Sequence, residues 1–244
     1  MNGTVALARR LVAEAVGAGL LVAVVVGSGI AAARLSPDDV GLQLLENSLA
    51  TGGGLAVLIA WLGPVSGGHF NPAVSIADWW LGRESGTGLS VPDLGAYVAA
   101  QLGGGVVGAM LANVMFAEPV ARWSTTERTG GGLWLAEVVA TAGLVALIFA
   151  LIRTDRPGLV APLVGTYIGA AYWWTSSTSF ANPAVTVGRS ITDTFAGIAP
   201  SSVPGFLAAQ LVGAGVGVLL VKVLHPLSAL RRRQEATSST HPEA

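Results

Sequence analysis

Charged residues are scarce in this chain. Its 244 residues include 13 Lys or Arg and 14 Asp or Glu, so charged types make up 11% of the sequence, against about 25% in an average soluble protein. Because a soluble protein of this size needs a charged surface, this composition argues against a soluble fold. The net charge of −1 argues against nucleic acid as a partner, and the 52% of hydrophobic residue types excludes an intrinsically disordered chain.

Cysteine is absent, which excludes a disulfide framework, a thiolate metal site and a cysteine nucleophile. The three histidines, His69, His225 and His241, do not have the spacing of metal ligands. No pair of nucleophile and base stands out in the sequence. We therefore expect no enzyme activity, no bound metal and no cofactor.

Long apolar stretches take up most of the chain. A helix needs about 20 mainly apolar residues to span a bilayer, and six stretches qualify, at 11–33, 43–65, 94–117, 133–152, 158–178 and 203–224. Two shorter apolar pieces, near 71–82 and 182–192, are too short to cross as helices. We expect re-entrant half-helices there, which a membrane tolerates where they are buried in protein or line a wet cavity. The sequence predicts an all-α membrane protein with six transmembrane helices and two half-helices.

The second half of the chain repeats the first. Three segments recur in the same order, at offsets of 123, 111 and 109 residues. The pairs are 13–16 (AEAV) with 136–139 (AEVV), 70–75 (FNPAVS) with 181–186 (ANPAVT), and 99–104 (AAQLGG) with 208–213 (AAQLVG). Each repeat, about 8–118 and about 130–225, has three spans, and because three is odd the second copy is inverted in the membrane. The offsets predict a longer first loop in the first repeat, around 34–46.

Each expected half-helix opens with the same motif, Asn71-Pro72-Ala73 in the first and Asn182-Pro183-Ala184 in the second. Asparagine is a favoured N-cap, proline fits the first helical position and alanine is a good helix former. With the Asn oxygen engaged, the amide NH2 group is free to donate into a cavity. Two facing helix N-termini also oppose cations, including protons. One motif would indicate only a capped helix, whereas two of them favour the centre of a pore.

These motifs resemble those of the aquaporin and aquaglyceroporin (major intrinsic protein) family. The resemblance covers about Ala13 to Leu220 and includes the Ala-Glu pairs of the first and fourth spans and the segment 66–74 (SGGHFNPAV). It implies one pore per subunit, a homotetramer in the lipid bilayer, and passive movement of water and small neutral solutes without covalent chemistry. It also implies one channel domain over residues 1–230.

The distribution of Lys and Arg predicts the orientation. An even number of spans puts both ends on one side, which would hold nine Lys and Arg residues, Arg231–Arg233 among them, against four on the other side. By the positive-inside rule, both termini face the cytoplasm. We expect a multi-pass protein of the inner (cell) membrane, with a polar cytoplasmic tail over 231–244.

The resemblance departs from the family where selectivity is set. The family usually has Arg directly after the second motif, where this chain has Val185. Spacing from the two Asn residues places the other filter positions at Thr51, Ala170 and Ser179, and a shift of one or two residues from 170 would give Gly169, Ala171 or Tyr172. Small residues and the lost Arg indicate a wide pore. We expect it to pass glycerol-like polyols, urea-like molecules and undissociated metalloid hydroxides such as arsenous acid.

A narrower resemblance is to a bacterial branch of the family that is often linked with arsenic resistance, since Val185 and the phrase 181–186 look like that branch. Three alternatives remain beside the wide channel. They are a water-selective aquaporin, a non-conducting membrane scaffold and a secondary active transporter.

Four charged or titratable residues have two interpretations each. Glu14 and Glu137 lie in apolar spans, where a carboxylate is usually functional; their symmetry favours bracing of the segments before the half-helices over a proton relay. His69 is either a pH gate or, as we favour, a residue that fixes its loop. Arg189, one helical turn past Val185, would restore a cation at the pore mouth; we favour an exposed Arg189, or one paired with Asp193.

Overall fold

A computed structural model describes residues 5–227 of the chain, and all regular elements within that range are helices. The eight α-helices are α1 (Leu7–Leu35), α2 (Val40–Ser66), α3 (Pro72–Ser85), α4 (Val91–Met115), α5 (Gly131–Arg153), α6 (Val160–Trp174), α7 (Pro183–Arg189) and α8 (Val203–Leu224). Short 3₁₀ turns, η1 (Pro157–Leu159) and η2 (Pro200–Ser202), precede α6 and α8. The expected tail at 231–244 and the arginines at 231–233 lie outside the described residues.

Five segments are long and apolar enough to cross a membrane: α1, α2, α4, α5 and the η2–α8 segment. The expected span at 158–178 is shorter in the structure, because α6 has only 15 residues. At about 1.5 Å per residue, these give about 22 Å of helix. The helix ends at Trp174 because the residues after it form the turn that leads into α7, where the Thr178 N–H donates to the Thr175 carbonyl at 3.2 Å.

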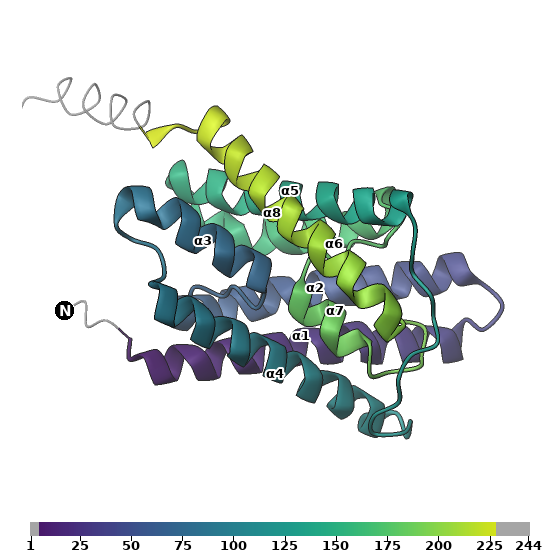
Figure 1. Ribbon diagram of the computed structural model, residues 1–244. Helices are drawn as coiled ribbons and strands as arrows, with labels where there is room; N and C mark the ends of the chain where they lie inside the picture. Colours follow the sequence, from purple (N-terminus) through teal and green to yellow (C-terminus); the bar gives the residue numbers. More distant parts are fainter. Residues whose placement is uncertain (1–4, 228–244) are drawn as a thin grey trace, which may run out of the picture.

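The long helices surround the two short ones (Figure 1). Helix α1 packs against α2 and α4, α5 packs against α8, and α2 packs against α6 across the repeats. Helix α7 lies near the middle of the view and α3 lies to its left, and the two short helices contact each other, α4 and α8. Helix α1 begins and helix α8 ends on the same side of the molecule, at the left of Figure 1, as expected because α6 adds a sixth crossing to the five longer segments.

The first repeat differs from the second in having longer helices, and its first loop is not the longer one. Helices α1 and α2 have 29 and 27 residues, and their counterparts α5 and α6 have 23 and 15. Only residues 36–39 separate α1 from α2, so the expected long loop at 34–46 is wrong. The physical reason is a helix cap, since the Asp39 carboxylate accepts the Leu42 N–H at 2.9 Å and starts α2 early.

Glycines bring the paired helices together. Gly104 and Gly108 of α4 face the backbone of α1, and Gly213 and Gly217 of α8 face the backbone of α5. A Cβ on Gly217 would stand 2.7 Å from the Ala142 carbonyl oxygen, closer than real Cβ contacts. Each crossing is thus set by a pair of small residues four positions apart, and the two crossings hold the frame around α3 and α7.

Candidate functional site

The two short helices begin in the same way. Asn71 caps α3 and Asn182 caps α7, and in each case a proline takes the first helical position. Each Asn side-chain oxygen accepts the backbone N–H of the alanine two residues later, at 2.9 Å in both copies. Helix α3 then runs for 14 residues and α7 for only 7, so both are too short to span a membrane, as expected of half-helices.

The two caps are also joined to each other across the repeats. The Asn71 amide donates to the Ala181 carbonyl at 2.8 Å, and the Asn182 amide donates to the Phe70 carbonyl at 2.9 Å. Each NH2 group carries two hydrogens, so one is used here and one remains. The sequence suggested a wholly free NH2 group, and the structure corrects this because each motif meets the loop of the other repeat.

Glu14 holds the loop before α3. The side chain is fully buried, and its carboxylate accepts four hydrogen bonds. The donors are the Ser66 hydroxyl at 2.6 Å, the His69 N–H at 3.1 Å, the Phe70 N–H at 2.7 Å and the Gln101 amide at 2.7 Å. These four hydrogen bonds stabilise the buried negative charge of the carboxylate, so no cation is needed beside it.

Glu137 holds the loop before α7 in the same manner. It is also fully buried and accepts the Phe180 N–H at 2.9 Å, the Ala181 N–H at 2.8 Å and the Gln210 amide at 2.6 Å. Ala181 and its counterpart Phe70 both have φ of 48°, in the left-handed region that non-glycine residues rarely adopt. The two carboxylates therefore stabilise a strained backbone directly before each Asn.

His69 is tied into the first loop at two points. Its backbone N–H donates to Glu14, and its ring Nδ1 lies 3.0 Å from the Ser75 hydroxyl. The Gln101 amide donates to the same hydroxyl at 2.9 Å. In the second repeat the Gln210 amide donates to the Thr186 hydroxyl at 2.8 Å, so the polar contacts around the two motifs follow the sequence repeat.

A cavity of about 510 Å³ runs past both Asn side chains. Most of its wall is apolar and comes from α1, α2, α5 and α6, while α4 and α8 contribute no lining residue within the described part of the chain. Its lining includes Pro157 and Gly158, which come directly before α6, and Arg189, the last residue of α7. The polar lining residues are Thr51, His69, Asn71, Asp78, Tyr172, Ser179, Asn182 and Arg189.

Three of the four expected filter residues line this cavity: Thr51, Ser179 and Val185. Ala170 does not, because its side chain is exposed on the outer face of α6. Two residues along a helix correspond to about 200° of rotation, and so Tyr172 faces the cavity instead. Its hydroxyl donates to the Thr51 hydroxyl at 3.2 Å.

Arg189 lies inside the protein. Only 3% of it is exposed, it lines the cavity, and its Nε donates to the Ala196 carbonyl. The guanidinium carbon lies 3.4 Å from the centre of the Phe180 ring. The favoured expectation of an exposed Arg189, or one paired with Asp193, is therefore wrong; Asp193 pairs with Arg122 at 3.4 Å.

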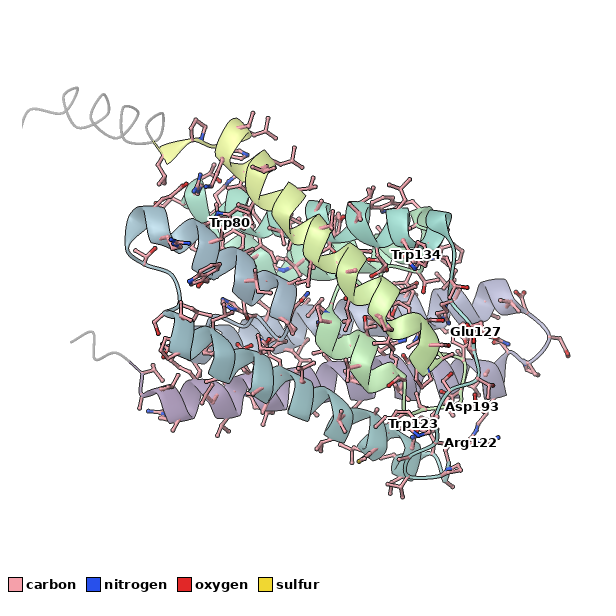
Figure 2. The ribbon with its side chains drawn as sticks, viewed as in Figure 1. Trp80, Arg122, Trp123, Glu127, Trp134 and Asp193 are labelled. Carbon is pink, nitrogen blue, oxygen red and sulfur yellow. The ribbon has the colours of Figure 1, made fainter. Side chains whose placement is uncertain are left out.

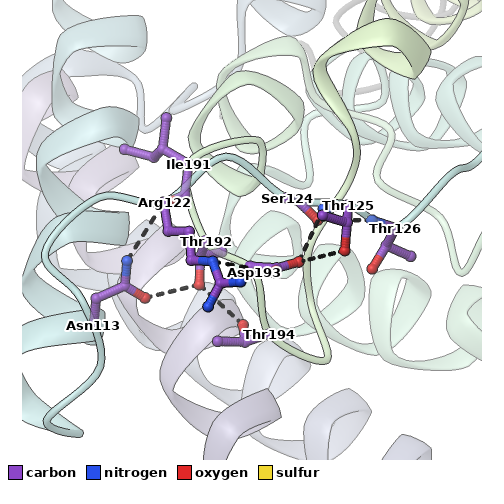
Figure 3. A network of polar contacts seen from close by, with 9 residues as sticks. All are labelled: Asn113, Arg122, Ser124, Thr125, Thr126, Ile191, Thr192, Asp193 and Thr194. Carbon is purple, nitrogen blue, oxygen red and sulfur yellow. Dashed lines mark hydrogen bonds and ion pairs between the residues drawn. The ribbon is translucent and has the colours of Figure 1, made fainter.

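A polar network fixes the loop that follows α7 (Figure 3). The Asp193 carboxylate accepts the Thr125 N–H at 2.9 Å and the Thr125 hydroxyl at 3.0 Å, and the Thr192 hydroxyl donates to Asn113 at 2.7 Å. Figure 2 shows Asp193 and Arg122 together at one end of the molecule. The hydrogen bonds from Thr125 hold the pKa of Asp193 below its usual value. The network joins the segment between the repeats to the loop that carries Ala196.

Phe180 and Asp78 are two further residues of the site that the sequence motifs do not mark. The repeat itself contained the signal, because the offset of 111 residues that relates the two motifs also relates His69 to Phe180 and Asp78 to Arg189. All four line the cavity. Aligning the two repeats beyond the motifs would have paired a carboxylate with a guanidinium at equivalent positions.

Comparison with known proteins gives three matches over most of the chain. The family model described as "Major intrinsic protein" matches residues 1–179. Aquaglyceroporin AqpS of Rhizobium meliloti (strain 1021) is 51% identical over 228 residues, which cover 93% of this chain and 95% of that protein. The X-ray structure of the aquaglyceroporin from Plasmodium falciparum has a TM-score of 0.70 and 20% identity, covering 92% of this chain and 100% of that one.

A more distant relative is Aquaporin Z of Photorhabdus laumondii subsp. laumondii, which is 33% identical over 172 residues, or 64% of this chain and 71% of that protein. The family model covers the first motif and ends before the second. The similarity to AqpS and the shared fold extend over both. From its sequence and its fold, the chain belongs to the major intrinsic protein family.

Proposed function

We propose that this protein is a passive membrane channel for small uncharged solutes and water, and that its pore is the cavity of about 510 Å³. The observation that carries the proposal is that this cavity passes both Asn caps. The Asn amides lie where two helix N-termini meet, so they can offer hydrogen-bond donors to a passing solute. The positive ends of the two helices oppose cations at the same point.

The narrow part of this pore is formed by Thr51, Tyr172, Ser179 and Val185 in our proposal. Tyr172 replaces Ala170 there, so the filter has one aromatic residue among three small ones. The Val185 side chain carries no charge and no hydrogen-bond donor, so the carbon atoms of a solute can pass along it. The hydroxyls of Thr51, Tyr172 and Ser179 can exchange hydrogen bonds with the hydroxyls of the same solute. This combination favours glycerol-like polyols and undissociated metalloid hydroxides such as arsenous acid. The relative AqpS is named an aquaglyceroporin, which agrees with the first of these two solute classes.

Glu14 and Glu137 are braces in this proposal and do not relay protons. Glu14 accepts four hydrogen bonds and Glu137 three, all from groups of the loops or of nearby helices. Neither carboxylate lines the cavity. A coupled transporter would need an ionisable group that meets the solute or the solvent, and these two do not.

We further propose that the channel is a single domain over residues 1–230 in the inner (cell) membrane, with both termini cytoplasmic, and that it assembles as a homotetramer. The ends of α1 and α8 that lie on one side carry Arg9, Arg10 and Lys222, as the positive-inside rule requires of the cytoplasmic face. Chemical cross-linking of the purified protein tests the tetramer, and a labelling experiment on intact cells tests the side of each terminus.

Stopped-flow light scattering on proteoliposomes tests the function. We expect water and glycerol to enter vesicles that contain the protein faster than empty vesicles, and arsenous acid uptake to rise as well. Water permeation without uptake of either solute would show a water-selective channel, and no permeation at all would support a membrane scaffold. As a matched variant, Val185→Arg restores the usual family residue, and we expect it to lower glycerol uptake more than water flow.

A further inference from the structure

The pore lacks a cation at residue 185 but has one a helical turn away. Val185 and Arg189 are four residues apart on α7 and therefore share a face of that helix. Both line the cavity, and both are at least 95% buried. The charge missing from the filter is thus present in the same wall, displaced toward the end of the pore where α7 ends.

Two contacts hold the guanidinium of Arg189 in place. Its Nε donates to the Ala196 carbonyl, and its Cζ lies 3.4 Å from the centre of the Phe180 ring. Phe180 is itself fixed by an edge-to-face contact with Phe206, at 5.0 Å between ring centres. A cation over an aromatic face in a buried site is a strong interaction, so the charge has a defined position.

The remaining donors of Arg189 have no protein partner within residues 5–227. In that part of the chain Arg189 makes no ion pair and no hydrogen bond other than the one from Nε, and its side chain lines the cavity. Its terminal nitrogens are not among the buried unpaired atoms, so they are open to the cavity and can donate to a solute there. The Ser179 hydroxyl in the same wall is a buried polar group without a partner, which is rare in native proteins and indicates a place where a ligand completes its hydrogen bonds.

We infer that Arg189 is the residue that sets charge selectivity in this pore and that, together with Ser179, it forms a site for the oxygen atoms of a neutral polyhydroxy solute. The inference rests on the proposed channel function. The guanidinium repels protons and other cations before they reach the Asn caps, and its terminal nitrogens donate to hydroxyl oxygens of the solute. The apolar Val185 side chain, one turn further in, faces the carbon atoms.

The two ends of the pore differ in charge as a result. The residue that the repeat relates to Arg189 is Asp78 on α3, which also lines the cavity and accepts the Leu89 N–H at 2.9 Å. A carboxylate attracts cations, so the Asp78 end cannot exclude them. Exclusion therefore falls to the Arg189 end and to the helix N-termini at the centre.

Proton flux and solute flux through the full-length protein in proteoliposomes test this inference. The main variant is Arg189→Ala. Its matched control is Arg128→Ala, because Arg128 also donates to the loop after α7, to the Gly197 carbonyl at 2.8 Å, and lies 5.4 Å from the Phe180 ring. Arg128 does not line the cavity.

We expect Arg189→Ala to raise proton conductance at least about tenfold, the effect of removing a unit charge a few ångströms from the path, while Arg128→Ala leaves it unchanged. We expect Ser179→Ala to lower glycerol uptake about two- to fivefold, the loss of one hydrogen bond, without any effect on proton conductance. An unchanged conductance in folded Arg189→Ala would overturn the inference, and so would an equal rise in both arginine variants, since Arg189 would then serve only to hold the loop.

A second pair of variants covers the case in which Arg189→Ala does not fold. Arg189→Lys keeps the charge and Arg189→Gln removes it while keeping a donor for the Ala196 carbonyl. Raised proton conductance in the Gln variant alone supports the inference, and equal conductance in the two contradicts it. The proposed function is tested separately, by solute uptake into proteoliposomes that contain the wild-type protein. If the wild type passed no solute, the proposed function would be contradicted, whatever the proton conductance of the Arg189 variants.

Discussion

The loop before α3 and the loop before α7 are held in the same way. In each, a buried glutamate accepts the N–H groups of the last two residues before Asn, and a glutamine from α4 or α8 donates to that glutamate. The two Asn caps then exchange hydrogen bonds across the repeats. The repeats keep these groups because both loops must present strained backbone to the same central point.

The two repeats differ further from the centre. His69 in the first loop corresponds to Phe180 in the second, and Asp78 on α3 corresponds to Arg189 on α7. All four residues line the cavity, and within residues 5–227 none of their side chains forms a hydrogen bond with the other repeat's motif. The two repeats therefore share the same residues where they hold the two Asn caps together. Elsewhere along the pore, equivalent positions can carry residues of different charge and polarity.

The largest effect is expected from the glutamates. Glu137→Gln should lower the free energy of unfolding by about 3 kcal/mol, because the amide has one acceptor oxygen for three N–H donors and leaves at least one of them buried and unpaired. Glu14→Gln should cost less, about 2 kcal/mol, since one of its donors is the Ser66 hydroxyl, which can rotate away. Thermal unfolding of the solubilised protein, followed by tryptophan fluorescence, measures both.

This comparison also separates the brace from a proton relay. A relay predicts that the Gln variants unfold like the wild type and lose any pH dependence of solute flux. A brace predicts the opposite pattern, with lower stability and an unaltered pH profile. Wild-type stability in both variants would therefore contradict the role that we assign to Glu14 and Glu137.

An intermediate effect is expected from the Asn caps. Asn71→Ala and Asn182→Ala each lose a cap, worth about 1 kcal/mol, and a hydrogen bond across the repeats, worth about 1 kcal/mol. Asn182→Ala should be the more harmful, because α7 has 7 residues against 14 in α3 and fewer hydrogen bonds of its own to hold it. The same unfolding assay measures the difference.

The control for the caps is replacement by aspartate, which keeps the capping oxygen and removes the amide donor. The stability lost in Asn71→Asp and Asn182→Asp should therefore reflect the missing hydrogen bond across the repeats together with the added negative charge, and not the loss of the cap. If the two Ala variants differed in the reverse order, then the length of the half-helix would not decide how strongly its cap is needed.

The smallest effect is expected at the loop after α7, which is longer than the corresponding loop after α3. The pKa of Asp193 is lowered mainly by hydrogen bonds from Thr125. A carboxyl with a lowered pKa stabilises the fold above its usual pKa and loses that contribution as the pH falls through the lowered value. We expect the protection factor of the Thr125 amide, its hydrogen exchange compared with that of an unstructured amide at the same pH, to be high at neutral pH and to fall as Asp193 is protonated.

Two variants check this assignment. Asp193→Asn should lower the protection factor of the Thr125 amide at neutral pH and remove the fall of that protection in acid. Arg122→Ala should change little, because the Arg122 side chain is 64% exposed and exposed ion pairs contribute little. Exchange in Asp193→Asn that equals the wild type at neutral pH would show that the loop is held by other contacts.

Much of the site could be predicted because its signals are local. An Asn-Pro pair caps a helix whatever surrounds it, and a glutamate repeated at equivalent places in two apolar spans must find donors. By contrast, Ala170 was assigned to the filter from its spacing in the sequence. Spacing alone does not determine which face of α6 meets the cavity. Only the packing of α6 against α2 turned Tyr172 inward.

Arg189 shows most clearly what depends on tertiary structure. The sequence by itself determined the apolar stretches, the inverted repeat, the paired caps and the absence of a charge at Val185, since each follows from composition or from contacts within a few residues. It did not determine whether Arg189 meets solvent or the cavity. That depends on where the Phe180 ring and the Ala196 carbonyl are placed, and the second is placed by a network between Asp193 and Thr125, 68 residues apart. Contacts between residues so far apart in the sequence depend on how the repeats pack. Only the folded chain therefore shows that Arg189 places a positive charge beside the cavity.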